Sequence, residues 1–493
     1  MTTFYLSNMI SVEKVDKRTK YERFDAFLSD KGRLIYSAPF RRMQQKAQVF
    51  SLESNSAVRS RLSHSLEVAH IGAYISHAIT KEIKSEENQT NQNKKFWTEH
   101  ELSINTIVET TCLMHDIGNP PFGHFGESTI CEWFKDDERI AHILHKAEII
   151  SDRQNLCDCI KQKLFLSDFT MFDGNPQAIR IATKLQGDDG LTGLNFTYTQ
   201  IASSLKYTFG GCNFKKDKDN HLSSKLGYFS TEEDIIKSTW KNLGIPHNGR
   251  HPLTFIMEAA DDISYCTSDI DDGIENKVVT GKALFDFIND KTKNSKITDP
   301  DAISIIEICA GKQNNKKISQ FTEFKTNLSK RLVSKAAKRF YENFENIMNF
   351  KFTEPLLNEK EEDGGILHIL NLVKEFTREH IFNHADVEMV ELSGHSIITG
   401  ILNSYRPILE LSDTEFRKLI NRGKSDVSKV AQRLFRTLPE KYVKSFKAQI
   451  DKGVDDKYIE WNLRAHLIID FISGMTDQFA LELYQSLAGI KVR

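Results

Sequence analysis

Residues 112–128 read CLMHDIGNPPFGHFGES and place four ionisable side chains directly after an apolar run. The letters leading into this segment, TIVETTCLMHD, have apolar residues at helical spacing, so we expect a helix that Gly118 stops. The NPPFG sequence that follows is a rigid loop, because it contains two adjacent prolines. A second helix is expected to begin near His124. His115 and Asp116 should therefore lie at the C-terminal end of a helix, where a site can open.

The helical spacing of this segment recurs along most of the chain. Only 10 prolines and 25 glycines occur in 493 residues, and regular strand alternation is scarce. Long segments with helical periodicity include LSHSLEVAHIGAYISHAI, PLTFIMEAADDISYCTSDI and LRAHLIIDFISGMTDQFALELYQSL. The predicted fold class is therefore all-α, with little or no sheet. Polar stretches at residues 81–95, 213–224 and 309–320 are expected to be solvated surface loops.

The composition excludes several classes of protein. A net charge of −2 argues against a globally basic nucleic-acid binder, although it is compatible with a local basic patch. The apolar segment HLIIDFISGM is too short and too polar to span a bilayer, and the first twenty residues contain no apolar signal region. Seven cysteines without a CxxC pair are typical of free thiols in a reducing compartment. These features predict a cytoplasmic protein with no membrane contact.

Three further sets of polar residues have helical spacing, so the members of each set should project from one helix face. They are Arg61 and His64 in RSRLSHSLEVAH; His124 and Glu127 in GHFGE; and Asp261, Tyr265 and Asp269 in EAADDISYCTSD. Residues from these sets could point into one cleft together with the His115–Asp116 pair.

Two imidazoles and two carboxylates in this collection have the donor types of a metal site. The four residues are His64, His115, Asp116 and Asp261. This mixture suits a borderline or hard divalent cation such as Mn²⁺, Fe²⁺ or Mg²⁺ better than a thiolate zinc site. It also leaves coordination positions for water and a substrate oxygen, as catalysis requires. The competing interpretation of a lone His-Asp pair is chance, because such pairs are common without a metal.

The order of these groups, a His, then His-Asp, then a distant Asp, resembles the signature of the HD phosphohydrolase superfamily. The segments RLSHSLEVAHIG, HDIGNPPFGHFGE, EAADDISY and DFISGMTDQFALELY together resemble bacterial deoxyguanosinetriphosphate triphosphohydrolases. The similarity runs from YSAPFRRMQQKAQVF almost to the C-terminus, and NPPFGHFGE is absent from a bare HD protein. It implies hydrolysis of a dNTP, with dGTP favoured, to a deoxynucleoside and tripolyphosphate. Attack would occur at the α-phosphorus, and the 5′-oxygen of the sugar would leave.

The resemblance also implies a role for individual residues. The implied metal ligands are His64, His115, Asp116 and Asp261, and the implied catalytic pair is His124 and Glu127. The implied substrate contacts are Arg61, Lys206 and Lys225 at the phosphates, Gln48, Tyr265 and Asp269 at the sugar, and Glu391 and Arg433 near the rest of the nucleotide.

Elementary chemistry agrees with these implied roles. A triphosphate carries about four negative charges, so cations must line its cleft. A carboxylate that accepts a bond from the 3′-OH, with a ring packed against the bare C2′, would prefer deoxyribose to ribose. Guanine presents N1–H and N2–H₂ as adjacent donors, which one carboxylate could accept together. The plainer interpretations are a solvated face for Lys206 and Lys225, an exposed helix position for Glu391, and a backbone hydrogen bond for Gln48.

No internal repeat and no long linker divides the chain, so residues 1–493 are expected to form one large helical unit. Residues 35–275 should hold the catalytic core motifs. Residues 276–493 should form a helical extension that completes the nucleotide site and makes oligomer contacts. The resemblance implies homo-oligomers, including hexamers, and single-stranded DNA as a further partner.

Two alternative functions remain open at this point. One is an HD-type phosphodiesterase or nucleotidase acting on another nucleotide, against which the GHFGE window argues. The other is a nucleotide-regulated protein that binds single-stranded nucleic acid and has lost its chemistry. The intact set of metal-ligand residues argues against that loss.

Overall fold

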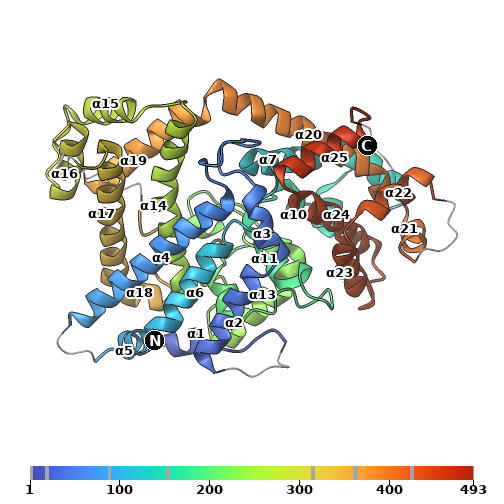
Figure 1. Ribbon diagram of the computed structural model, residues 1–493. Helices are drawn as coiled ribbons and strands as arrows, with labels where there is room; N and C mark the ends of the chain where they lie inside the picture. Colours follow the sequence, from blue (N-terminus) through green and yellow to red (C-terminus); the bar gives the residue numbers. More distant parts are fainter. Residues whose placement is uncertain are drawn as a thin grey trace.

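The computed structural model describes residues 4–16, 22–86, 90–151, 156–312, 317–358, 365–421 and 427–491. Helices make up the regular structure of these residues (Figure 1). The described residues contain no sheet, and their only β-type pairing is two isolated bridges, one joining Lys14 to Thr197 and one joining Ala47 to Ser60. The all-α prediction is confirmed.

Three helices that pack against one another hold the predicted site. They are α4 (Arg61–Lys84), α6 (Glu101–Met114) and α14 (Pro252–Glu275). The start of α4 is set by a capping box, in which Ser60 Oγ accepts from the Ser63 N–H and Ser63 Oγ accepts from the Ser60 N–H. The predicted ends are also confirmed, because α6 stops one residue before the His-Asp pair. The next helix, α7 (Gly123–Lys135), begins one residue before the second histidine.

The C-terminal helices pack against α7 and against one another. Helix α20 (Ala385–Leu409) lies alongside both α7 and α25 (Asp477–Leu487) (Figure 1). Helix α24 (Lys457–Ser473) is enclosed on all sides, since every residue from 461 to 473 is buried. A helix buried all round is expected to be apolar on every face, and the polar side chains of α24 therefore need buried partners.

The other helices surround these elements. They are α1 (Leu6–Met9), α2 (Arg23–Ile35), α3 (Ala38–Arg42), α5 (Gln92–Glu99), α8 (Asp137–Lys146), α9 (Asp158–Lys163), α10 (Ser167–Thr170), α11 (Gly174–Arg180), α12 (Tyr198–Ser203), α13 (Glu233–Leu243), α15 (Gly281–Thr292), α16 (Pro300–Cys309), α17 (Gln320–Glu342), α18 (Phe344–Met348), α19 (Ile366–Thr377), α21 (Asp413–Ile420), α22 (Lys429–Thr437) and α23 (Glu440–Ile450).

A buried ion network joins the core to α24. Arg180, at the end of α11, donates through Nε to Asp470 Oδ1 (2.8 Å) and through Nη2 to Asp470 Oδ2 (2.9 Å). Its Nη1 also donates to Glu232 Oε1 (3.1 Å). All three residues are at most 2% exposed. Charges at this depth are tolerated only when their partners compensate the lost hydration, so the network ties the two parts of the chain together.

The polar stretches predicted as loops are only partly solvated. In residues 81–95, α4 continues to Lys84 and α5 begins at Gln92, while residues 87–89 lie outside the described residues. In residues 213–224, Leu222 is buried and His221 Nε2 lies 2.8 Å from Glu258 Oε1, so this end of the segment packs onto the core. The loop prediction is confirmed for residues 215–219, which are exposed and form no helix or strand, and it fails only at the end of the segment, because a polar composition does not reveal a buried partner elsewhere in the chain.

The predictions about membrane spans and about the cysteines can both be checked in the described residues. Each helix found there is too short or too polar to cross a lipid bilayer. All seven cysteines are described, and each is a free thiol.

Replacing Arg180 with Met should lower the free energy of unfolding by about 3 to 5 kcal/mol, because Asp470 then loses its buried cation and Glu232 keeps only the neighbouring Lys184. Urea denaturation followed by circular dichroism measures the change. Arg406→Met is the matched control, since Arg406 forms a partly exposed pair with Glu410 (2.6 Å). The control should cost at most about 1 kcal/mol. Equal losses in the two variants would contradict a special role for the buried network.

Candidate active site

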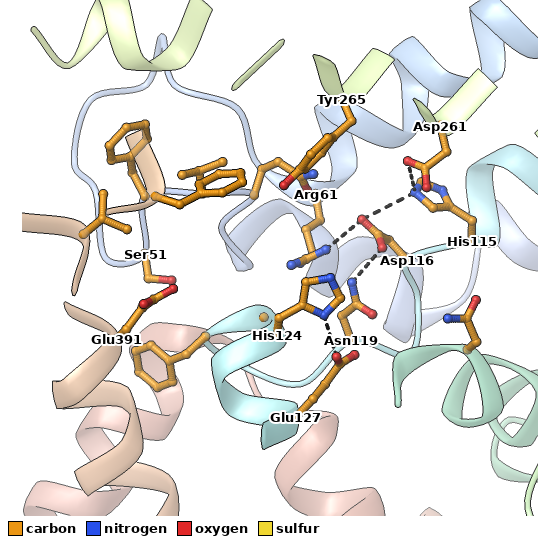
Figure 2. Close-up of a pocket in the computed structure, with 18 of the residues that line it drawn as sticks. Ser51, Arg61, His115, Asp116, Asn119, His124, Glu127, Asp261, Tyr265 and Glu391 are labelled. Carbon is orange, nitrogen blue, oxygen red and sulfur yellow. Dashed lines mark hydrogen bonds and ion pairs between the residues drawn. The ribbon is translucent and has the colours of Figure 1, made fainter. Parts of the chain in front are cut away.

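A cleft of about 430 Å³ opens between α4, α7, α14 and α20 (Figure 2). It brings together most of the residues predicted for the site, although they are spread over more than three hundred positions of the chain. The predicted residues that line it are Gln48, Arg61, His115, Asp116, His124, Glu127, Lys206, Lys225, Asp261, Tyr265 and Glu391.

Two imidazoles and a carboxylate meet at the inner end of the cleft. Asp261 Oδ1 lies 3.2 Å from His64 Nε2 and 3.4 Å from His115 Nε2. One donor atom from each of the three residues lies within 4.8 Å of the other two, which is close enough for a shared cation. The His115 Nδ1–H donates to the carbonyl oxygen of Cys112 (2.7 Å), so Nε2 is the nitrogen turned toward the cluster.

The surroundings of His115 Nε2 indicate whether these residues fit a metal ion. His115 Nε2 is buried and faces Asp261 Oδ1 and Asp116 Oδ2, but at 3.4 and 3.5 Å it makes no well-formed hydrogen bond. A buried polar atom that lacks a good hydrogen bond is costly, and a cation bound between these atoms would satisfy it. Two imidazole nitrogens and carboxylate oxygens also match the ligands that divalent transition ions accept. The residues therefore fit a divalent metal ion, whose identity the donor types leave open.

Asp116 lies at the edge of this cluster. Its Oδ2 is 3.5 Å from His115 Nε2 and accepts a bond from Arg61 Nη1 (2.8 Å). Its Oδ1 accepts from Asn119 Nδ2 (2.6 Å). Figure 2 shows these links as a chain from Asp261 through His115 and Asp116 to Arg61 and Asn119. The carboxylate is therefore held in place by two donors before any ligand enters.

In the cluster, burial is opposed by the attraction between its carboxylates and the neighbouring cationic groups, and this attraction sets the direction of the pKa shifts. Burial opposes a charge on His115, but Asp116 and Asp261 outweigh it and raise the pKa of His115 to about 9. Burial likewise opposes ionisation of Asp116, yet Arg61 and His115 lower the pKa of Asp116 to about 2. The pKa of Asp261 falls well below its usual range, against burial, because of His115 and His64. The two carboxylates thus favour positive charge between them.

A second His-acid pair lies nearer the mouth of the cleft. The His124 Nδ1–H donates to Glu127 Oε2 (2.6 Å), and Glu127 Oε1 accepts from the N–H of Gly174 (2.8 Å). Glu127 is buried, whereas the His124 side chain is 79% exposed. The hydrogen bond and the charge of Glu127 raise the pKa of His124, and burial opposes this rise only partly. His124 therefore presents its free Nε2 side to the cleft, and Glu127 favours the protonated form of the ring.

The backbone conformation of the turn into α7 orients His124 and Glu127. Phe122 and Gly123 have φ values of 62° and 55°, both in the left-handed region. A Cβ added at Gly126 would lie 2.1 Å from the carbonyl oxygen of Pro121, so only glycine fits there. The NPPFGHFGE sequence thus folds as a sharp turn that returns the chain over the same cleft.

Cationic side chains line the wall between the two pairs. Lys206 Nζ lies 3.7 Å from Asp261 Oδ2, and Lys225 Nζ donates to Asp173 Oδ2 (2.7 Å). Burial opposes charge on Lys206, but Tyr207 and Asp261 raise its pKa. Burial is likewise outweighed at Lys225, whose pKa is raised chiefly by Asp173. With Arg61 they form a cationic wall inside the cleft, which is not the solvated face weighed in the sequence analysis.

The far end of the cleft, away from the His-Asp cluster, is more apolar. Tyr265 and Glu391 project into it from α14 and α20 (Figure 2). The Phe382 ring lies 6.1 Å from the Tyr265 ring, and Phe50 and Val390 also line the cleft. Burial and the nearby Glu388 raise the pKa of the Glu391 carboxyl. This end could enclose a flat ring against aromatic side chains.

Four of the predicted residues have features that the sequence did not reveal. Gln48 Oε1 is buried without a hydrogen bond, so it is not tied to the backbone as the plainer interpretation held. Asp269 lies one turn beyond Tyr265, is fully buried and is not among the residues that line the cleft. His64 is buried behind Asp261. Arg433 is exposed on α22 and is not among the residues that line the cleft, so the structure does not bring it to this site.

Several lining residues were missed by the sequence analysis. They are Val49, Phe50, Ser51, Glu53, Asn119, Phe122, Asn175, Tyr207, Met257, Phe382, Asp386, Val387 and Val390. Val49 and Phe50 follow Gln48 within the segment KAQVF, and Asn119 stands inside the opening motif, so position alone could have suggested these three. No local pattern distinguishes Phe382 or Val390 from ordinary core residues.

Comparison with known proteins places the chain in a family. Residues 61–182 match the HD domain, and residues 419–486 match the phosphohydrolase-associated domain. The chain is 36% identical to the deoxyguanosinetriphosphate triphosphohydrolase of Salmonella paratyphi A, over 96% of this chain and 95% of that protein. It is 35% identical to the enzyme of the same name from Yersinia pseudotuberculosis, over 95% and 94% of the two chains. With this similarity along nearly its whole length, the chain belongs to the deoxyguanosinetriphosphate triphosphohydrolase family of HD-domain proteins.

Proposed function

We propose that this protein is a metal-dependent dNTP triphosphohydrolase that converts dGTP and water to deoxyguanosine and tripolyphosphate. The observation that carries the proposal is one cleft that contains a His-His-Asp cluster, a separate His-Glu pair and a cationic wall between them. The relatives from Salmonella and Yersinia bear the name of this activity. Nothing in the cleft favours the alternative of a binding protein that has lost its chemistry.

The proposed metal ligands are His64, His115, Asp116 and Asp261. The ion would be Mn²⁺, Mg²⁺ or Fe²⁺, since the donors are imidazoles and carboxylates without a thiolate. When bound, such an ion lowers the pKa of a coordinated water and neutralises charge on a phosphate oxygen.

The phosphates and the leaving oxygen are assigned to the other charged groups. Arg61, Lys206 and Lys225 would bind the triphosphate and neutralise part of its charge. As the water oxygen forms its bond to the α-phosphorus, the bond from phosphorus to the 5′-oxygen breaks, and the proton that the water loses is released to solvent. His124 would donate its Nε2 proton to that departing oxygen, because Nδ1 is already held by Glu127. Glu127 keeps the ring oriented and protonated until the transfer.

The sugar and base are assigned to the apolar end of the cleft. Gln48 and Tyr265 would contact the deoxyribose, with Asp269 behind Tyr265 as a further acceptor. Glu391 would accept the two adjacent donors of guanine. Arg433 is left out of this set, because it lies outside the cleft.

Assembly and nucleic-acid binding stay predictions of the family resemblance. We propose that residues 35–275 form the catalytic core and that residues 276–493 complete the site and contribute oligomer contacts. Met389 and Leu392, on α20 beside the cleft, are 63% and 56% exposed, which supports an oligomer contact there. A hexamer and binding of single-stranded DNA remain predictions of the same kind, as does a cytoplasmic location.

The reaction itself is tested by its products. Purified protein with Mn²⁺ or Mg²⁺ should release a deoxynucleoside and tripolyphosphate, and dGTP should react faster than dATP, dCTP or dTTP. GTP is the matched control for the sugar and should react more slowly than dGTP. Chromatography of the nucleoside and phosphate products decides the result. Release of orthophosphate or pyrophosphate would contradict attack at the α-phosphorus.

The two His-acid pairs should respond differently to mutation. His115→Ala should lose the bound metal and all turnover, because it removes a ligand. His124→Ala should keep the metal and lose about 10²- to 10⁴-fold in kcat, because it removes only the proton donor. Metal analysis of the purified variants and kcat for dGTP measure both effects.

His77→Ala, on an exposed part of α4, serves as the control and should match the unmodified protein in both readings. Loss of metal in His124→Ala would refute the separation of roles.

The pH dependence should report the charge on His124. If the imidazolium donates the proton, kcat falls as the pH rises through the pKa of His124. Glu127 raises that pKa, while Lys225 and Arg61 lower it. Glu127→Gln should therefore move the alkaline limb of the kcat profile to lower pH, and Lys225→Met should move it to higher pH. The measurement is kcat against pH at saturating dGTP and metal. A shift of the alkaline limb in the same direction in both variants would contradict His124 as the proton donor.

A further inference from the structure

Asp477, the first residue of α25, is buried and binds two loops of the cleft at once. Its Oδ2 accepts a hydrogen bond from the backbone N–H of Ala47 (3.0 Å). Its Oδ1 accepts one from the backbone N–H of Phe122 (3.1 Å). The side chain is not among those that line the cleft, and the residue is only 4% exposed. One carboxylate therefore joins the C-terminal helices to two segments that are far away in the sequence.

Lys46 makes a second link between the same three segments. Its buried ammonium donates to the carbonyl oxygens of Asn119 and of Ser473, the latter at 2.7 Å. Its own carbonyl oxygen accepts from the N–H of Arg61 (2.9 Å), at the start of α4. Lys46 is likewise absent from the cleft lining. The last turn of α24 and the first turn of α25 thus hold both loops from behind.

The backbone atoms held in this way lie next to proposed functional side chains. Ala47 precedes Gln48, and Phe122 stands two residues before His124. Asn119, whose carbonyl oxygen Lys46 binds, also donates its amide to Asp116 Oδ1 (2.6 Å). A shift of either loop would therefore displace the side chains at the sugar, at the leaving oxygen and at the edge of the metal cluster.

The loop at Phe122 needs support from outside itself. Phe122 has a φ of 62°, a left-handed conformation that non-glycine residues adopt rarely and that persists where the surroundings enforce it. Asp477 binds the N–H of this residue. On the other side α20 is so close that a Cβ at Gly394 would lie 2.6 Å from the Phe122 ring. The strained turn that aims His124 is thus enclosed by the C-terminal helices.

We propose that Asp477 and Lys46 are positioning residues for the hydrolysis, which fix the Gln48 and His124 loops relative to one another without touching the nucleotide. This inference rests on the function proposed above for His124. By this proposal the C-terminal extension orients the catalytic side chains, although Asp477 itself does not line the cleft.

Asp477→Asn tests the proposal with little change in volume, because the amide nitrogen cannot accept the second N–H. We expect kcat for dGTP to fall about 10- to 100-fold, while the KM changes less than kcat. Metal content and the midpoint of thermal unfolding should stay close to those of the unmodified protein. Glu482→Gln is the matched control on the same helix. The Glu482 side chain bonds only to Gln478, and the variant should be fully active.

A double-mutant cycle with His124 separates positioning from general damage. In the His124→Ala background, Asp477→Asn should cost clearly less in residual kcat than in the unmodified protein, because the part of the loss that acts through His124 is already gone and only the part that acts through the Gln48 loop is left. An equal loss in both backgrounds would overturn the proposal. A low kcat in His124→Ala together with normal kcat in Asp477→Asn would refute the positioning role alone. A normal kcat in His124→Ala would refute the proposed function of that residue, and the inference with it.

Lys46→Met keeps the proposal testable if Asp477→Asn does not fold. The variant removes the bonds to Asn119 and Ser473, and we expect the same loss of kcat and the same non-additivity with His124→Ala. A normal kcat in a folded Lys46→Met protein would overturn the proposal.

Discussion

Two half-buried carboxylates that lie side by side, Asp116 and Asp261, impose the constraint on which the site depends. Ionised groups at this depth must be compensated, and each of their neighbours supplies part of that compensation. Arg61 binds Asp116, and His64 and His115 lie within 3.4 Å of Asp261. Because these groups come from α4, from the end of α6 and from α14, the cluster also links the three helices. The negative charge of the two carboxylates, at the point where these helices meet, therefore favours a bound cation.

The two His-acid pairs of the opening motif have different environments, and this difference explains how one short segment serves two purposes. His115 is held from behind by the Cys112 carbonyl oxygen and turns its other nitrogen toward the buried cluster. His124 is held by Glu127 and is largely exposed to the cleft. A buried imidazole between carboxylates suits metal binding, whereas an exposed and protonated imidazole suits proton transfer. The rigid turn between the helices brings both pairs to one cleft.

The C-terminal half of the chain supports this centre mainly through buried polar contacts. Arg180 binds Asp470 on α24, and Asp477 binds the backbone of both cleft loops. Buried charged groups are poor sources of net stability but demand one geometry, because a misplaced partner leaves a charge unpaired. The family match at residues 419–486 covers the helices that make these contacts, so the similarity extends to the structural support of the site.

The sequence by itself determined the features that depend on residues close together in the chain. Helical periodicity predicted the all-α class, the end of α6 and the start of α7, since each follows from side chains within one or two turns. The spacing of His124 and Glu127 placed them together for the same reason. Only the tertiary structure decided contacts between distant segments. Lys225 pairs with Asp173, Phe382 lines the cleft, Asp477 reaches Ala47, and Arg433 stays outside although its helix forms. Local propensity carries no information about which faces meet, because that choice is made by burial and charge pairing across the whole fold.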